Sequence, residues 1–191
     1  KKVLAKEPGN TDACHFMGAI ACQEGHFQLC VELISKAITI NSNNATFHNN
    51  LGKGYEGLNK LDDARSCFEK AILINPSYAI AYFNLGKVCH GQMRFDDAVE
   101  KYQTAISLQP NLVQALQGLG NTLKEQGKTE EAVKFLRQAV ELSPKDTSLR
   151  NDLGSALSTI ADYSSATENF LTALAINPNS AAAHNNLGIV L

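Results

Sequence analysis

Apolar and small residues recur along the chain with a period of 34 residues. Numbered in slots from Thr11, each block has glycine at slot 8, alanine or cysteine at slot 20, a large apolar residue at slot 24 and alanine at slot 27. All five prolines fall at slot 32, and only Ser42 interrupts their series. A fixed period of this length indicates a repeat architecture, in which each repeat is one unit of secondary structure.

Each block predicts two helices, because apolar residues recur at three- and four-residue steps in both of its halves. Glycine inside a helix costs about 1 kcal/mol relative to alanine. We therefore expect the slot-8 glycine to face the small slot-20 residue and to bring the two helices of a repeat close together. Proline then ends the second helix. A polar residue after the proline region is expected to cap the next helix; the candidates are Asn44, Ser77, Asn111, Asp146 and Ser180.

The period also sets the predicted boundaries. Five full repeats are expected at 11–44, 45–78, 79–112, 113–146 and 147–180, after the tail of an earlier repeat at 1–10. Residues 181–191 read as the first helix of a truncated sixth repeat. Since Leu187, Val190 and Leu191 would then lie uncovered, the sequence predicts a piece of a longer array that can associate end to end.

The pattern L-G…Y…A…F…A…P at this period resembles the tetratricopeptide repeat, and the resemblance covers residues 11–191. It implies an all-α, right-handed solenoid of antiparallel helix pairs. It also implies that the first helix of each repeat lines a concave inner face with slots 2, 5, 6, 9, 12 and 13. Tryptophan, common at slot 4 of that family, is absent from the chain.

Composition narrows the possible functions. The net charge is −2, so we expect no nucleic-acid partner, since phosphate binding needs a clustered basic surface. No run of 18 apolar residues predicts a membrane span. Five cysteines, an odd number, suggest reduced thiols and a cytoplasmic setting.

Candidate catalytic and metal sites are weak. Cysteine and histidine gather between Cys14 and Cys30 without the close C-x-x-C pairs of a zinc site, so no metal or cofactor is expected. No nucleophile motif or phosphate loop occurs, and we expect this chain not to be an enzyme.

The inner face implied by the resemblance is rich in amides. An Asn side chain both donates and accepts, so one amide per repeat could hold every third residue of an extended peptide. Ile80 and Phe83 could form an apolar pocket, and Lys53 and Lys87 could attract an acidic group. The alternatives are that the amides are merely solvated and that Phe83 packs against a neighbouring repeat. The predicted peptide-binding residues are Asn49, Asn50, Lys53, Ile80, Phe83, Asn84, Lys87, Gln117, Asn121, Asn151, Asp152 and Asn186.

The sequence thus predicts a protein–protein interaction scaffold that binds extended peptide segments. One subfamily of tetratricopeptide proteins grips the C-terminal carboxylate of a partner in a site called a carboxylate clamp. That kind of site is excluded here, because the basic residues that it needs are missing. The strings His48–Gly52 and His184–Gly188 resemble the arrays that precede O-linked N-acetylglucosamine transferase domains. That likeness implies one alternative, a substrate-recruiting arm of a glycosyltransferase. A self-assembling structural array is the other.

Overall fold

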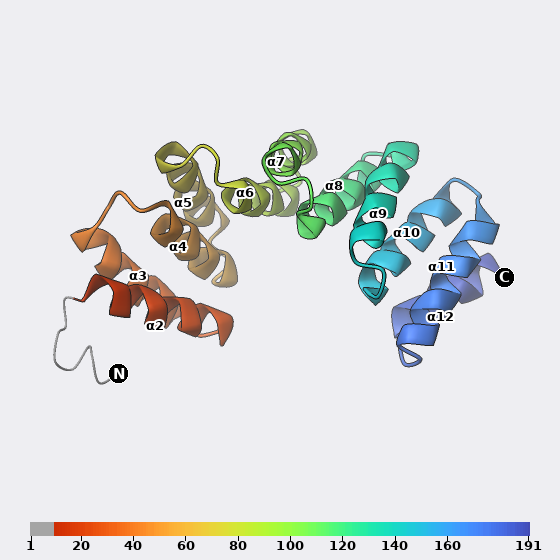
Figure 1. The fold of residues 1–191 in the computed structure, drawn as a ribbon, viewed down its shortest axis with the longest axis horizontal. Helices are drawn as coiled ribbons and strands as arrows, with labels where there is room; N and C mark the ends of the chain where they lie inside the picture. Colours follow the sequence, from red (N-terminus) through yellow and green to blue (C-terminus); the bar gives the residue numbers. More distant parts are fainter. Residues whose placement is uncertain (1–9) are drawn as a thin grey trace. The chain divides into compact units, whose positions relative to one another are not determined.

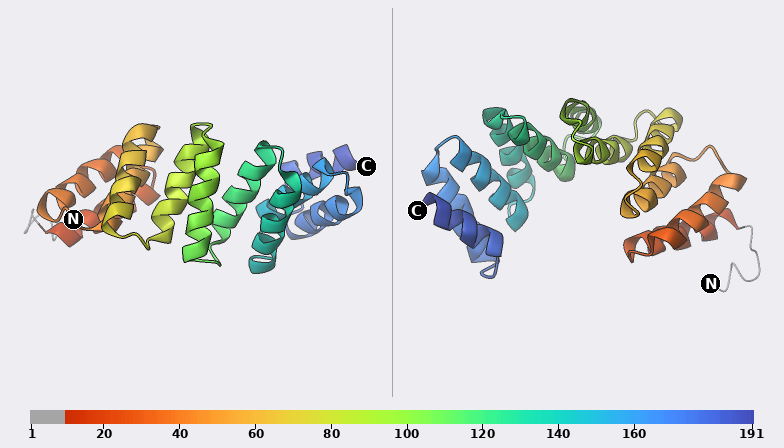
Figure 2. Two further views of the ribbon diagram at one scale, coloured as in Figure 1. Left: turned by 90° about the horizontal axis from the view of Figure 1, so that it is seen from above. Right: turned by 180° about the vertical axis from the view of Figure 1, so that it is seen from behind.

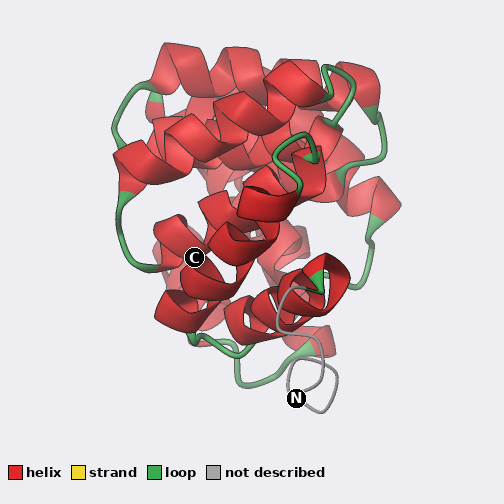
Figure 3. Ribbon diagram, turned by 90° about the vertical axis from the view of Figure 1, so that its left-hand side faces the viewer, coloured by secondary structure: helices red, strands yellow, loops and turns green. Residues whose placement is uncertain are grey.

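The computed structural model describes residues 10–191, and all regular structure in that range is helical (Figures 1 and 3). The predicted tail at 1–10 lies outside the described residues except for Asn10. The chain divides into two compact units, Lys1–Arg94 and Phe95–Leu191. We call them the N-terminal and the C-terminal unit. The boundary falls in the turn between the two helices of the third predicted repeat.

The N-terminal unit contains α2 (Thr11–Gln23), α3 (Phe27–Ile40), α4 (Ala45–Gly57), α5 (Leu61–Ile74) and α6 (Ala79–Gly91). The C-terminal unit contains α7 (Phe95–Leu108), α8 (Val113–Glu125), α9 (Thr129–Leu142), α10 (Thr147–Thr159), α11 (Tyr163–Ile176) and α12 (Ala181–Val190). The even-numbered helices, which we call A helices, each begin 34 residues after the one before, and so do the odd-numbered B helices. Consecutive helices such as α8 and α9 lie side by side (Figure 2).

The slot-8 glycines make room for a large side chain, which corrects the sequence-based prediction. A Cβ added at Gly52 would lie 2.6 Å from Phe68 Cε1, and one added at Gly154 would lie 2.5 Å from Phe170 Cε1. Both aromatic residues occupy slot 24 and are fully buried. Slot 8 therefore faces slot 24 rather than the small slot 20, and glycine lets the aromatic ring lie against the A-helix backbone.

In the first full repeat, the small slot-20 residue faces the next repeat instead. Cys30 is fully buried, and its Sγ lies 3.0 Å from a Cβ built on Gly54 of α4. Each unit has its own core of such contacts. The N-terminal core gathers around Ile34, Phe47 and Leu51, and the C-terminal core around Leu136, Leu153 and Phe170.

Helix starts follow the capping prediction at three of its five positions. Asn44, Asp146 and Ser180 are N-caps whose side chains accept backbone N–H groups. At α6 and α8 the prediction is wrong, because the N-cap residues are Tyr78 and Leu112, without side-chain capping bonds. Ser77 and Asn111 lie one residue too early. The cap position itself is taken by an apolar residue, which at Leu112 is buried.

The turn between the two helices of a repeat has one conformation throughout. Slot 15 is left-handed in all five turns, at Gly25, Asn59, Met93, Gly127 and Ala161, with φ between 57° and 80°. Only Gly25 and Gly127 adopt this conformation without steric cost. Three repeats therefore accept local backbone strain to keep the geometry of the turn.

Candidate functional site

The A helices form the inner layer of each unit. Within the N-terminal unit α2 contacts α4 and α4 contacts α6, and within the C-terminal unit α8 contacts α10 and α10 contacts α12. Among the described residues, the B helices within a unit make no such contacts with one another. The predicted inner face therefore lies along neighbouring A helices, whose slot-5 and slot-6 side chains meet.

In the N-terminal unit these side chains bond to each other across repeats. Asn84 Nδ2 donates to Asn49 Oδ1 at 2.9 Å, and Asn50 Nδ2 lies 2.9 Å from His15 Nε2. In both pairs slot 5 of one repeat meets slot 6 of the next, 35 residues later. Asn49 Nδ2 also donates to Asn50 Oδ1 at 3.4 Å, which links the two pairs.

The C-terminal unit repeats this arrangement. Gln117 Nε2 donates to Asp152 Oδ2 at 2.6 Å, and Asn186 Nδ2 donates to Asn151 Oδ1 at 2.9 Å. Asn121 at slot 9 adds a bond of 3.0 Å to the same Asp152 oxygen. We call the four slot-5 to slot-6 bonds the amide ladder. They connect adjacent A helices, so the ladder contributes to the coupling between repeats.

This geometry corrects the role predicted for Asn49 and Asn84. Their side chains are buried, with residue exposures of 2% and 5%, and they bond to each other. In this conformation neither amide can reach a peptide. The other ladder amides among the predicted residues are only half-buried.

His15 is a ladder member that the sequence-based set did not include. Because Asn50 Nδ2 is a donor, Nε2 of His15 accepts this bond in the neutral imidazole. The ring also lies against Phe47, with centroids 4.6 Å apart. Burial lowers the pKa of His15 below its ordinary value, against the opposing effect of the Asp12 charge. The ladder thus favours the uncharged ring.

The remaining predicted residues of the N-terminal unit form a smaller group. Lys87 Nζ bonds Glu56 Oε1 at 2.8 Å and lies 5.9 Å from the centre of the Phe83 ring. Ile80 and Phe83 are half-buried, and Lys53 is exposed. Since Lys87 is already paired with a carboxylate, Lys53 is the better candidate for attracting an acidic group.

Slot 4 holds a structural bond that the sequence did not reveal. His48 Nε2 lies 2.9 Å from Ser42 O, and His184 Nε2 lies 2.9 Å from Pro178 O. Arg150 Nε donates to Pro144 O at 2.8 Å. In each case slot 4 bonds the slot-32 carbonyl six residues earlier. The histidines of the two H-N-N-L-G strings therefore fix the loop between repeats.

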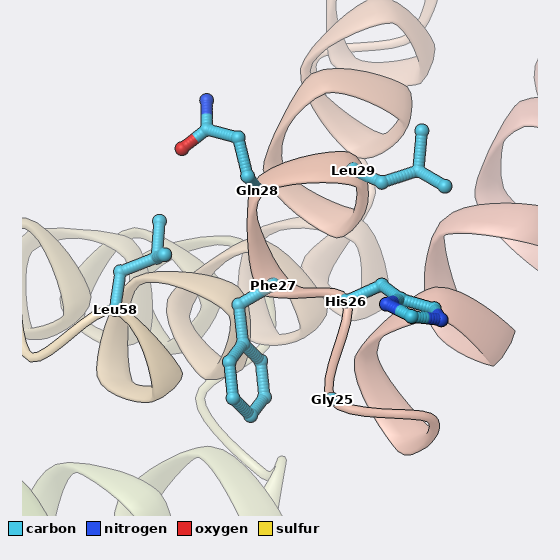
Figure 4. Close-up of a pocket in the computed structure, with 6 residues that line it drawn as sticks. All are labelled: Gly25, His26, Phe27, Gln28, Leu29 and Leu58. Atoms are coloured by element: carbon cyan, nitrogen blue, oxygen red, sulfur yellow. The ribbon is translucent and has the colours of Figure 1, made fainter.

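One hollow of the N-terminal unit lies away from the inner face. Its volume is about 550 Å³, and it is lined by the α2–α3 turn, the start of α3 and Leu58 (Figure 4). Gln28 and Leu29 point away from Phe27, so the lining side chains do not converge on one point. A preformed ligand site needs convergent polar groups, and this hollow lacks them.

The thiols near the predicted cysteine and histidine cluster interact with each other. A hydrogen bond between Cys22 and Cys30 lowers the pKa of Cys22 to about 7, and the same bond raises that of Cys30. All five cysteines are free. Within residues 10–191, no three histidine, cysteine or acidic side chains are placed to hold a metal ion, and no helix is long and apolar enough to cross a membrane.

Family and structure comparisons agree with this geometry. Residues 77–145 match the tetratricopeptide repeat family, and residues 55–92 match a second family described as TPR repeat. Together, the two matches cover residues 55–145. No curated protein matches the sequence.

Three solved structures have a similar fold. YrrB, described as a TPR protein with an unusual peptide-binding site, is 20% identical over 96% of this chain and 95% of its own, with a TM-score of 0.73. MamA is 28% identical over 75% of this chain and 84% of its own, with a TM-score of 0.68. A chain of the APC/C hetero-tetramer Cut9–Hcn1 is 18% identical over all of this chain and 38% of its own, with a TM-score of 0.89. The predicted all-α tetratricopeptide solenoid is thereby confirmed.

Proposed function

We propose that this chain is a non-catalytic scaffold that binds extended segments of other proteins along its inner face. One observation carries the proposal: the half-buried ladder amides of the C-terminal unit use only one end of each amide. Gln117 Oε1, Asn151 Nδ2 and Asn186 Oδ1 have no hydrogen-bond partner within residues 10–191. They offer both donors and acceptors, which are the groups a peptide backbone pairs with.

The spacing of the helices suits an extended ligand. Neighbouring packed helices lie about 8–10 Å apart, and an extended chain advances about 3.3 Å per residue. One free amide end per A helix therefore meets every third residue of the peptide. The free ends on α8, α10 and α12 would together hold about seven residues.

The comparisons support this class of function. The YrrB structure is described by its peptide-binding site, and Cut9–Hcn1 is a complex of two proteins. The five free thiols support our further proposal of a reducing, cytoplasmic setting.

The test is peptide binding by matched variants. An array of unbiased nonapeptides is probed with the wild-type chain, with Gln117→Ala/Asn151→Ala and with Gln103→Ala, an exposed amide on the B helix α7. Binding by the wild type and by Gln103→Ala, with at least tenfold weaker binding by the double variant at unchanged helicity, would support the proposal. Equal binding by all three chains, or by none, would refute it.

A second proposal, self-association, rests on exposed apolar side chains of the last helix. Ile189 and Leu191 are 71% and 89% exposed, whereas Leu187 and Val190 are partly buried against the C-terminal core, contrary to the prediction that all three named residues lie uncovered. Ile189→Lys/Leu191→Lys should then remove concentration-dependent dimers in light scattering. A wild-type chain that stays monomeric at high concentration rules this out.

The glycosyltransferase alternative rests on the sequence strings alone. Because their histidines bond loop carbonyls, the strings have a structural explanation that needs no shared partner. We therefore propose the general peptide-binding scaffold in its place.

A further inference from the structure

A small hollow opens on the inner face of the C-terminal unit, between α10, α11 and α12. Its volume is about 150 Å³. This is below the roughly 300 Å³ at which small-molecule pockets begin, so the hollow suits one side chain rather than a whole ligand. Its walls are Ser155, Ser158, Thr159, Phe170, Asn186 and Ile189.

The hollow exists because a bridge found between other repeats is missing here. Slot 12 of one repeat and slot 9 of the next meet across the inner face, as the 2.8 Å ion pair of Glu56 with Lys87 shows. At the equivalent position, the fifth and sixth repeats carry Ser158 and Ile189. A short hydroxyl and a branched alkyl group cannot bond each other, and the space between them stays open.

The walls of the hollow are uncharged and carry both polar and apolar groups. None of the six lining residues is charged. The Ser158 hydroxyl and Asn186 Oδ1 have no hydrogen-bond partner within residues 10–191, and Ser155 Oγ accepts from Lys124 Nζ at 3.2 Å while keeping its own O–H. Buried Phe170 adds an aromatic surface beside these groups. The hollow thus offers O–H donors, an amide acceptor and an apolar contact.

We propose that this hollow is the subsite for a glutamine side chain of the bound peptide. The inference rests on the proposed peptide-binding function and adds the identity of one recognised residue. The glutamine carbonyl accepts from the serine hydroxyls, its N–H₂ donates to Asn186 Oδ1, and its two methylene groups lie against Phe170 and Ile189. In glutamine, an uncharged amide with both donors and an acceptor lies at the end of two methylene groups.

Two side chains of the same length fit less well. A glutamate carboxylate only accepts, so it would face the oxygen of Asn186 without a proton between them. Its attraction to Lys124 is offset by Asp152, which lies three residues before Ser155 on the same helix. A methionine would fill the space but leave the serine hydroxyls and Asn186 unpaired, and unpaired buried polar groups are costly.

The experiment compares these three residues in one library. Nonapeptides with acetylated and amidated ends carry Gln, Glu or Met at one fixed position, with random mixtures elsewhere, and are selected on the immobilised full chain. The chain is used as wild type, as Ser158→Leu, which fills the hollow, and as Ser158→Ala, which removes only the hydroxyl. Ser164→Leu, at an exposed position of α11, is the matched control. Melting temperatures verify that every variant is folded.

We expect about tenfold enrichment of Gln over both Glu and Met at one position, equivalent to 1.4 kcal/mol. Ser158→Leu should abolish the preference, Ser158→Ala should reduce it severalfold, and Ser164→Leu should keep it. Peptide binding with Glu or Met equal to Gln, or with a Gln preference unaffected by Ser158→Leu, overturns the subsite but leaves the peptide-binding function intact. A wild-type chain that retains no peptide overturns both.

Discussion

The buried pair of Asn49 and Asn84 offers the most direct test of the amide ladder. Asn84→Ala removes the donor of a 2.9 Å bond and leaves Asn49 Oδ1, in a residue only 2% exposed, without it. An orphaned buried acceptor costs about 1–3 kcal/mol. Alanine recovers up to about 0.7 kcal/mol through its higher helix propensity. The free energy of unfolding should therefore fall by about 1.5 kcal/mol.

A double-mutant cycle isolates the bond itself. Asn49→Ala/Asn84→Ala leaves neither amide of this pair behind without its partner, so its loss should be smaller than the sum of the two single losses by about 1 kcal/mol. Asn185→Ala is the control, because Asn185 occupies slot 5 of α12, is exposed and has no partner within residues 10–191. It should be neutral or slightly stabilising.

Urea unfolding followed by far-ultraviolet circular dichroism measures all five chains: the wild type, Asn49→Ala, Asn84→Ala, the double variant and Asn185→Ala. A shift of midpoint at constant m-value reports stability rather than compactness. If the two single losses add to within about 0.3 kcal/mol of the double loss, the two amides are not coupled. The ladder would then be only solvated surface, as the alternative reading of the sequence supposes.

Three further changes test other parts of the structure. Gly154→Ala should destabilise the fold by about 1–3 kcal/mol in thermal melts, because the added Cβ meets the Phe170 ring. The control Gly188→Ala, whose Cβ would have nothing within 4 Å, should be neutral or stabilising. Equal effects would contradict the explanation that slot-8 glycines make room for a large side chain. Gly127→Ala should cost about 1–2 kcal/mol through its φ of 77° alone, and no loss would mean that the turn relaxes. Burial lowers the folded-state pKa of His15, so the contribution of His15 to stability should be complete above pH 6.5, the ordinary histidine value, and should decline as the pH falls toward the lower folded value. The difference in melting temperature between wild type and His15→Gln should therefore shrink as the pH falls through that window. A constant difference would rule out this linkage.

The positions of the helices could be predicted from the sequence because they depend on local signals. Periodic apolar residues set the helix faces, and proline and glycine set their ends. The observed A helices begin 34 residues apart, as the period requires. The sequence did not reveal which residues face each other where two helices pack together. The face of a helix does not reveal which neighbour it meets, so the sequence predicts a contact of slot 8 with slot 20, whereas slot 8 contacts slot 24 in the structure.

The burial of Asn49 and Asn84 escapes sequence-based prediction for a related reason. Slots 5 and 6 lie at the border between the contact of adjacent A helices and the open inner face, so a small rotation decides whether an amide is buried. The sequence does carry a signal of this contact, in the polar character of residue pairs that lie 35 positions apart. Four slot-5 to slot-6 pairs are polar on both sides, while the fifth combines Phe83 with Gly118, where neither side chain is polar. Comparing residues between repeats would have exposed this pairing.

The ladder explains how one set of amides can serve both stability and recognition. A side-chain amide has a donor end and an acceptor end, and one bond to the neighbouring repeat uses only one of them. Where both residues are buried, as in Asn49 and Asn84, the amides serve the contact between repeats alone. Where they are half-buried, as in Asn151 and Asn186, the bond holds the side chain in place and its free end faces outward. Such an amide loses little further conformational entropy when a peptide binds, since its rotamer is already fixed. Recognition should therefore concentrate in the C-terminal unit, and variants that break its ladder bonds should weaken peptide binding more than they weaken the fold.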